Sequence, residues 1–182
     1  LYRHFTRIPE AGKFVFLDSG WMDEVVEGRL HGELSEEKYA KRIESVRRFE
    51  RQLTDNGYLV MKFFLHISKK EQTRRMERLT DEKDTVWRVG KKDLWQNSHY
   101  EKCMDAFSSY LKSTNMPSAP WYIVDAKSKK WTELQVLETL TQGIDIALDN
   151  RDMAVPLLQN VFPLERMPLL SEIPLDKTLD EE

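Results

Sequence analysis

The sequence lacks the features that would place a protein outside the cytoplasm or within a membrane. It contains one cysteine, Cys103, so no disulfide can form within the chain, and a reducing compartment fits. The longest apolar stretch, residues 58–67, includes Lys62 and is too short to span a bilayer. Residues 1–10 lack an uninterrupted apolar run, so no signal peptide is visible. We therefore predict a cytoplasmic protein with no membrane contact.

A second absence concerns phosphate binding. No G-x-x-x-x-G-K-[ST] pattern occurs in the 182 residues, and Gly12-Lys13 lacks the upstream glycine. Because that loop supplies the backbone N–H groups that hold nucleotide phosphates, this chain has no such cradle. The four histidines show no metal-ligand spacing, and no serine stands in a nucleophile-elbow pattern. The net charge of −3 indicates no nucleic-acid partner, so an anion site must come from local clustering of Lys and Arg.

Short apolar runs alternate with amphipathic helices along the first 148 residues. The runs at 13–17, 58–67 and 121–124 are nearly unbroken, which is typical of parallel strands covered on both faces. Helices are expected at 22–30, from the N-cap Ser35 to Asn56-Gly57, from the Ser68–Glu71 capping box onward, around 100–111 and around 134–148. Residues 80–97 are expected to be irregular. This alternation predicts an α/β fold with a parallel sheet, right-handed crossovers and helices on both faces.

An aspartate ends two of the predicted strands. Asp18 follows the run at 13–17, and Asp125 follows the run at 121–124. Ligands of parallel sheets bind beyond the carboxyl ends of the strands, so both carboxylates belong at the edge where a ligand would lie. In phosphate-transferring α/β proteins an acid at this place holds Mg²⁺. The alternative is that Asp18 only caps the following helix.

Basic residues are dense in the helix that follows the second strand and in the segment after it. Arginine recognises phosphate oxygens with two hydrogen bonds, and a helix N-terminus adds backbone donors for an anion. The alternative is a solvated helix face whose partners are Glu71 and Glu77. The cations of the helix are Lys69, Lys70, Arg74, Arg75 and Arg78, and those of the following segment are Arg88, Lys91 and Lys92.

The composition changes at Arg151. Four prolines interrupt apolar residues without a period, which predicts an extended linker over residues 151–182 after a domain of residues 1–150. Apolar residues crowd together there, so this segment is expected to bury apolar surface against a second module or another copy. They are Val161, Phe162, Leu164, Met167, Leu169 and Leu170. Leu1 in place of Met and the helix-like start at 176–182 suggest a piece of a longer protein.

Several motifs together resemble the polyphosphate kinase 2 family over about residues 1–148. They are Phe49-Glu50-Arg51-Gln52-Leu53, Gly57-Tyr58, Lys62-Phe63-Phe64-Leu65-His66-Ile67-Ser68, Glu71-Gln72 with Arg75, Trp87-Arg88-Val89, Asp93, Tyr100 and Ala119-Pro120-Trp121. The resemblance implies a P-loop-kinase-like three-layer α/β/α fold with a helical lid, here truncated at its amino-terminal P-loop unit. It also implies phosphoryl transfer between polyphosphate and nucleotides with Mg²⁺.

The departures from the family pattern are equally specific. The family's Asp-Arg-Ser-Trp-Tyr is here Asp18-Ser19-Gly20-Trp21-Met22, which keeps the acid and loses the arginine. Leu79 stands where another arginine is usual, and the lid's Trp-Lys is Trp87-Arg88. This pattern is similar to the degenerate amino-terminal module of the fused, two-module polyphosphate:AMP phosphotransferases.

The resemblance therefore implies a parent enzyme, with polyphosphate and an adenine nucleotide as substrates, of which this piece is a non-catalytic module. Asp18 would be the remnant catalytic and Mg²⁺ site, and Trp87 and Asp93 would belong to the lid. The remnant phosphate-binding residues would be Arg74, Arg75, Arg88, Lys91 and Lys92. Two alternatives stay open: a structural module that completes a pseudo-dimer, and a nucleoside-monophosphate kinase.

Overall fold

A computed structural model describes residues 2–10, 12–149 and 161–163 of the chain. Within these residues one sheet has the strand order β1 (Lys62–His66), β2 (Trp121–Asp125) and β3 (Val161–Pro163). β1 and β2 are parallel, with Lys62 opposite Trp121 and His66 opposite Asp125. β3 pairs antiparallel with the other edge of β2. The predicted parallel pairing of the second and third apolar runs is therefore confirmed.

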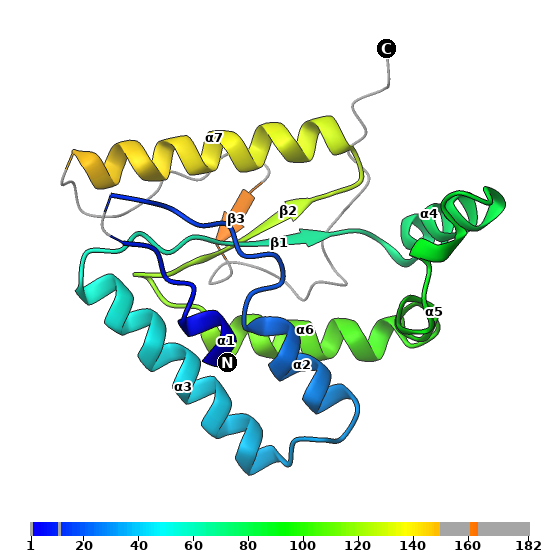
Figure 1. The fold of residues 1–182 in the computed structure, drawn as a ribbon, viewed down its shortest axis with the longest axis horizontal. Coiled ribbons are helices and arrows are strands. Elements are labelled where there is room, and N and C mark those ends of the chain that lie inside the picture. The colour runs from blue at the N-terminus through cyan, green and yellow to red at the C-terminus, as the bar shows by residue number, and fades with distance from the viewer. Residues whose placement is uncertain (1, 11, 150–160, 164–182) are drawn as a thin grey trace.

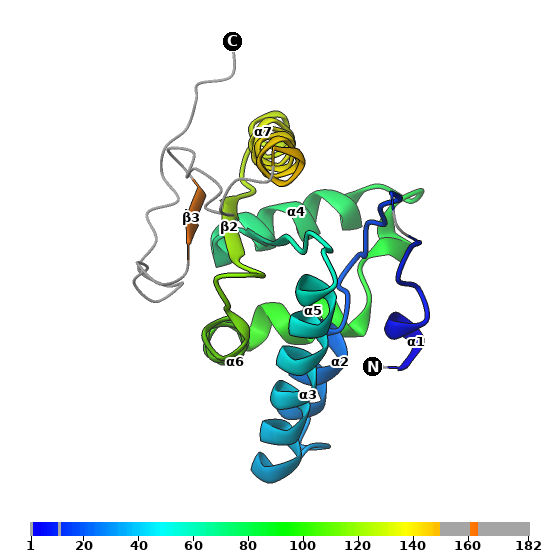
Figure 2. The ribbon, with the colours of Figure 1, turned by 90° about the vertical axis from the view of Figure 1, so that its left-hand side faces the viewer.

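Helices cover both faces of this sheet, so that the sheet and the two helical layers form three layers (Figures 1 and 2). α7 lies over one face, and α2, α3 and α6 lie under the other. The helices are α1 (Tyr2–Phe5), α2 (Met22–Leu30), α3 (Glu36–Asp55), α4 (Lys69–Asp81), α5 (Lys91–Ser98), α6 (Tyr100–Thr114) and α7 (Lys129–Leu148), with a short 3-10 turn η1 (Val86–Arg88). The predicted α/β class with helices on both faces is confirmed.

Local sequence explains where α3 begins and ends. The Ser35 hydroxyl accepts a hydrogen bond from the Lys38 N–H at 3.4 Å, and Glu36 and Glu37 occupy the first turn, where the helix dipole favours acids. Gly57, with a φ of 81°, takes the left-handed conformation that ends the helix. Between these ends, Tyr39, Ile43 and Val46 are buried at the spacing of one helix face.

The main core lies between the sheet and the layer of α2, α3 and α6. Val25 and Val26 of α2 meet Val46 of α3, Leu111 of α6 and Ile123 of β2 there. On the opposite face, Tyr122 and Val124 pack with Phe63 and with Val136 of α7. Cys103 is also buried in the main core.

The strand predicted at 13–17 is wrong. The segment has no strand pairing, and Phe14 and Phe16 are 80% and 72% exposed. An apolar run becomes a strand only when a neighbour supplies ladder hydrogen bonds, and among the described residues no strand pairs with β1 on the side away from β2. Residues 80–97 also differ from expectation, because η1 and most of α5 lie within them.

α7 packs on the sheet through a face that the apolar pattern of its sequence does not predict. Its buried residues are Thr132, Gln135, Thr139 and Gly143, whereas the apolar residues that mark the helix in the sequence point outward. Thr132 and Thr139 satisfy their hydroxyls on the preceding turn, at Ser128 O and Gln135 O. In the described part of the chain, no helix is both long and apolar enough to cross a bilayer.

Candidate anion site at the carboxyl edge of the sheet

The carboxyl ends of β1 and β2 point toward α4 and α5, which extend beyond the sheet (Figure 1). α4 begins directly after β1 because the Ser68 hydroxyl accepts the Glu71 N–H at 3.2 Å. β2 ends in Asp125, whose Oδ1 accepts the Lys127 N–H at 2.9 Å and so shapes the turn into α7. The edge thus consists of two strand ends and the helix starts that follow them.

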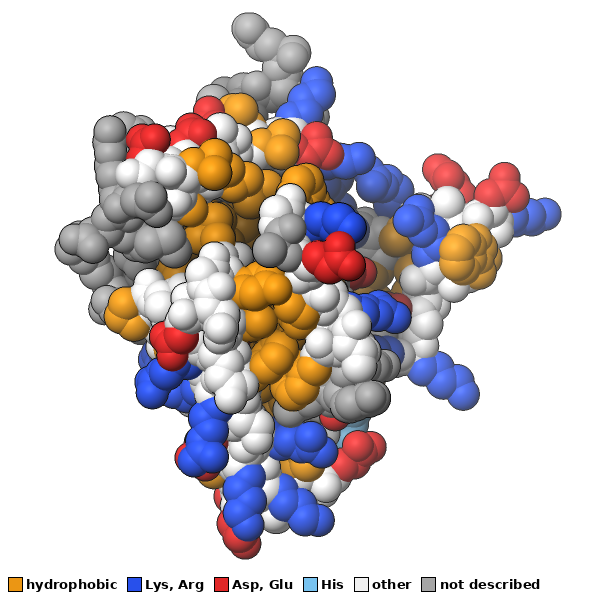
Figure 3. All heavy atoms as spheres, turned by 60° about the vertical axis from the view of Figure 1, so that its left-hand side comes forward, with side chains coloured by type: hydrophobic (Ala, Val, Ile, Leu, Met, Phe, Trp, Pro, Cys, Tyr) orange, Lys and Arg blue, Asp and Glu red, His pale blue; other side chains and the backbone are white. Residues whose placement is uncertain are grey.

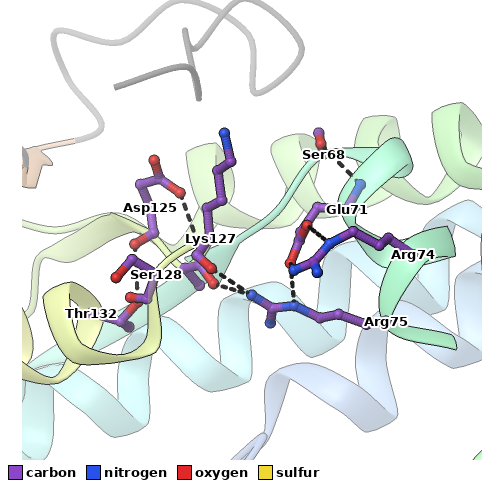
Figure 4. A network of polar contacts seen from close by, with 9 residues as sticks. Ser68, Glu71, Arg74, Arg75, Asp125, Lys127, Ser128 and Thr132 are labelled. Carbon is purple, nitrogen blue, oxygen red and sulfur yellow. Dashed lines mark hydrogen bonds and ion pairs between the residues drawn. The ribbon is translucent and has the colours of Figure 1, made fainter. Parts of the chain in front are cut away.

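Glu71 holds the two arginines of α4 that follow it (Figure 4). Arg74 donates two hydrogen bonds of 2.8 Å, one to each carboxylate oxygen, and Arg75 Nε donates to Oε1 at 2.7 Å. The carboxylate is buried, yet the hydrogen bonds from Arg74 and then Arg75 outweigh that burial and lower the pKa of Glu71 to about 2. The ionised form of Glu71 is therefore favoured, and this glutamate pairs with two cations of its own helix, as the alternative interpretation expects of it.

Arg75 also binds the backbone of the loop after β2. Its Nη2 donates to Ala126 O at 2.6 Å and to Lys127 O at 3.0 Å (Figure 4). These contacts connect α4 to the β2–α7 loop across the sheet edge. The guanidinium of Arg75 therefore holds the β2–α7 loop against α4. Most of its N–H donors are engaged by protein groups.

Lys92 lies against a different element. Its Nζ is 3.2 Å from Asp23 Oδ1 and 3.2 Å from Glu27 Oε1, both on α2. Burial alone would lower the pKa of Lys92, but the hydrogen bonds to Glu27 and Asp23 raise it. Lys92 thus anchors α5 on α2, while Arg74 and Arg75 converge on Glu71.

The segment of η1 and α5 presents the remaining predicted residues to solvent. Trp87 is 78% exposed, and its Nε1 donates to Asp84 O at 2.8 Å. Arg88 and Lys91 are exposed, and neither forms an ion pair with another described residue. Asp93 Oδ2 accepts the Gly90 N–H at 2.8 Å, which caps α5. This segment therefore combines two available cations with an exposed indole.

Asp18 lies in an exposed turn that leads into α2, next to Ser19 and Gly20 at φ values of 59° and 48°. In the described ranges no three His, Cys, Asp or Glu side chains gather as metal ligands. Mg²⁺ is often held by one or two carboxylates together with substrate phosphates and water. Asp18 alone fits that role only when a phosphate supplies the other ligands.

Sequence reasoning missed a buried ion pair between α3 and β1. Lys62 Nζ lies 2.6 Å from Glu50 Oε2 and donates to Thr114 O at 2.8 Å, while Trp21 Nε1 donates to Glu50 Oε1 at 2.9 Å. Burial raises the pKa of Glu50 and lowers that of Lys62, and their mutual attraction opposes both shifts. The available signal was a glutamate in register with the apolar face of α3, four residues after Val46.

Comparison with known proteins places these features in a family context. Residues 1–152 match the sequence profile of the family described as polyphosphate kinase 2. The polyphosphate:AMP phosphotransferase of Pseudomonas aeruginosa is 28% identical over 187 residues, which cover 100% of this chain and 37% of that protein. The AMP/ADP-polyphosphate phosphotransferase of Meiothermus ruber is 28% identical over 147 residues, covering 79% of this chain and 55% of that protein.

Solved structures described as polyphosphate kinase 2 have a fold similar to that of this chain. The crystal structure of polyphosphate kinase 2 from Arthrobacter aurescens TC1 superposes with a TM-score of 0.74 at 28% identity, covering 87% of this chain and 54% of that one. The structure of a putative polyphosphate kinase 2 from Pseudomonas aeruginosa PA01 has a TM-score of 0.77 at 24% identity, which speaks to the fold alone. The chain spans little more than half the length of these relatives, or less.

Proposed function

Because the chain belongs to the polyphosphate kinase 2 family, we propose that it is a non-catalytic module of a polyphosphate:AMP phosphotransferase. In such an enzyme a phosphate oxygen of AMP attacks the terminal phosphorus of polyphosphate in line. A new P–O bond forms as the bond to the next phosphate breaks, and the shortened polyphosphate leaves. Residues 1–150 would form the module, and residues 151–182 would link it to a second one.

The observation that supports this proposal is that cations near the sheet edge are already paired with groups of the protein. Phosphoryl transfer depends on positioning and on charge neutralisation by preorganised groups. Arg75 is bound to Glu71 and two backbone carbonyls, and Lys92 is bound to two carboxylates of α2. The sequence also has no phosphate-loop pattern. Within these 182 residues a polyphosphate chain would therefore find no phosphate-loop pattern, and within their described part it would find no free set of converging cations.

The exposed residues of η1 and α5 would still contact the polymer. Arg88 and Lys91 are available cations, and Trp87 adds an exposed aromatic face. Mg²⁺, held by polyphosphate oxygens and Asp18, would contribute charge neutralisation. The module would thus retain weak, salt-sensitive affinity for polyphosphate without turning it over.

The test is a coupled assay of the purified 182-residue chain with Mg²⁺, polyphosphate and AMP or ADP. We expect no product above background, because losing one charge-stabilising donor typically costs about 10²–10³ in rate and this chain lacks several. A polyphosphate kinase 2 enzyme that has the phosphate-loop pattern is the positive control. Ser19→Arg alone should not restore activity, because the cradle is still missing. Product that scales with chain concentration and disappears in Asp18→Asn would show that the module is catalytic.

A further inference from the structure

α7 exposes a row of large aliphatic side chains along its outer face. Leu134, Leu137, Ile144 and Leu148 are all exposed, the last of them to 75%. Figure 3, in which α7 stays at the top, shows hydrophobic side chains along it and on the surface below it. Scattered single leucines on a surface are ordinary, but a contiguous row marks a contact site. We call these four residues, with Thr141 between them, the α7 stripe.

The stripe cannot be explained as a core face that is poorly packed. The opposite side of α7 already packs on the sheet through Thr132, Gln135, Thr139 and Gly143, all of them buried. Turning the stripe inward would bring these residues to the surface and would break the contact of Val136 with Tyr122 and Val124. The apolar row is therefore an outer feature of a helix whose inner face is complete.

The spacing of the stripe identifies the shape of its occupant. Its positions, 134, 137, 141, 144 and 148, are separated by three, four, three and four residues. That alternation is the a and d seam along which two α-helices pack with side chains interlocked. The seam extends over about 21 Å, from 1.5 Å of rise per residue. A partner helix of four turns would cover it.

The charges beside the seam identify the chemistry of that helix. Five positions between 133 and 147 flank the seam, and none of them is basic. Three are exposed acids, Glu133, Glu138 and Asp145, and the other two are Leu140 and Ala147. The only cations of α7, Lys129 and Lys130, precede the stripe, and Lys129 Nζ lies 3.8 Å from Glu133 Oε1 in an exposed ion pair, so Glu138 and Asp145 are the flanking acids that have no such pair among the described residues. Flanking positions contact one another across a helix pair, so a second copy of α7 would place acids against acids.

We propose that the α7 stripe is the docking site of an amphipathic helix with apolar residues at three-four spacing and Lys or Arg at the flanking positions. The helix lies along α7, buries the leucines and pairs its cations with Glu133, Glu138 and Asp145. This inference does not depend on the proposed function, because it uses only the exposure, spacing and charge of one helix.

Two synthetic peptides test the proposal by fluorescence anisotropy with the 182-residue chain. Both are 21-residue helices with leucine at the a and d positions, and one has lysine and the other glutamate at the flanking positions. The lysine peptide should bind, and the glutamate peptide should bind at least tenfold more weakly. Leu137→Gln together with Ile144→Gln should weaken the lysine peptide at least tenfold, with an unchanged circular dichroism spectrum because both side chains are exposed. Val86→Gln, an exposed apolar residue of η1, is the matched control and should leave binding unchanged.

Other occupants would give distinct results. Equal affinity for both peptides, no binding of either, or binding that survives the double substitution would overturn the proposal. A dimer in sedimentation velocity that the double substitution dissociates would assign the stripe to a second copy instead. Binding that appears only after deletion of residues 164–182 would assign it to that segment of the same chain.

Discussion

Glu50 and Lys62 form an ion pair inside the core, where α3 faces β1. Glu50 is fully buried, and each of its oxygens has a partner, Lys62 on one side and Trp21 on the other. Such a pair gains little net stability over apolar residues of the same size, because both charges lose their hydration. Replacing only one of the two side chains, however, leaves the other charge buried without a partner.

We therefore expect each single substitution at this pair to be far worse than the double one. Glu50→Leu or Lys62→Met alone should lower the free energy of unfolding by about 3–5 kcal/mol, since one buried charge is stranded. The double variant should recover most of that loss. Urea unfolding of the four proteins measures the coupling, and a double variant whose loss equals the sum of the singles would mean that the two side chains act independently.

Glu71 makes the free energy of unfolding depend on pH in the acid range. Its pKa is about 2 in the folded protein and 4.5 in its ordinary state, so its contribution is complete above about pH 5. The contribution decreases as the pH falls from the ordinary value toward 2, because the unfolded chain takes up the proton first. Arg74 is 63% exposed, and solvent screens part of the interaction.

Glu71→Gln should accordingly lower the free energy of unfolding by roughly 2 kcal/mol at pH 7, from 1.36 kcal/mol per pKa unit reduced for screening. The difference from wild type should shrink between pH 5 and pH 3. Glu77→Gln, an exposed glutamate of the same helix, is the control and should change little at either pH. A difference that stays constant with pH would show that Glu71 acts through packing and not through its charge.

At the scale of elements, α5 is connected to α2 by contacts that are mostly on the surface. Lys92 reaches Asp23 and Glu27, and the His31 ring lies 4.7 Å from the ring of Trp95. α4 is held more firmly, since Arg75 binds the backbone of the β2–α7 loop. The two helices beyond the sheet edge therefore differ in how strongly they are attached.

Lys92→Ala should loosen α5 without unfolding the protein. Exposed ion pairs contribute about 0–1 kcal/mol, so the global free energy of unfolding should fall by no more than that. Hydrogen exchange of residues 91–98 should become faster, because α5 loses its anchor on α2. Lys91→Ala, which removes an exposed lysine without an ion pair, should leave the exchange of α5 as in wild type. Equal effects of the two substitutions would contradict the anchoring role.

At the scale of the whole molecule, the sheet is unequal at its two edges. β3 pairs with the outer edge of β2, whereas the other edge, beside β1, has no paired strand among the described residues. Uncovered sheet edges promote association with other chains. The exposed Phe14 and Phe16 lie in the segment that was expected to be a strand of this sheet. The rest of the tail expected to bury apolar surface, residues 164–170, lies outside the described residues.

Truncation tests whether β3 belongs to the module. Deleting residues 150–182 removes three cross-strand pairs on β2 and should cost about 1–2 kcal/mol of unfolding free energy, at 0.2–1 kcal/mol per pair, with increased aggregation. Deleting only residues 164–182 keeps β3 and should therefore keep the part of the unfolding free energy that these three pairs contribute. Thermal unfolding and light scattering of both variants measure this. Equal stability of the two would place the boundary of the module at residue 150.

The sequence by itself determined several helix boundaries, two of the strands and the family of this protein. Ser35 and Ser68 mark two helix starts through their own hydroxyls, and Gly57 ends α3 through its backbone freedom, so these boundaries depend on few neighbours. The runs at β1 and β2 are apolar enough to be strands in any sheet that covers them. The motifs shared with polyphosphate kinase 2 are linear in the chain, and the fold of the solved relatives bears out the α/β class they imply.

Only the tertiary structure decided which groups face one another. Residues 13–17 have strand composition but no pairing, because pairing requires a second backbone that composition does not reveal. The outward stripe of α7 and its polar inner face depend on how the helix meets β2. Arg75 and Lys92 look alike as basic residues, yet Arg75 reaches two carbonyls of the β2–α7 loop and Lys92 reaches two carboxylates of α2, because long-range contacts assign a charge its partner.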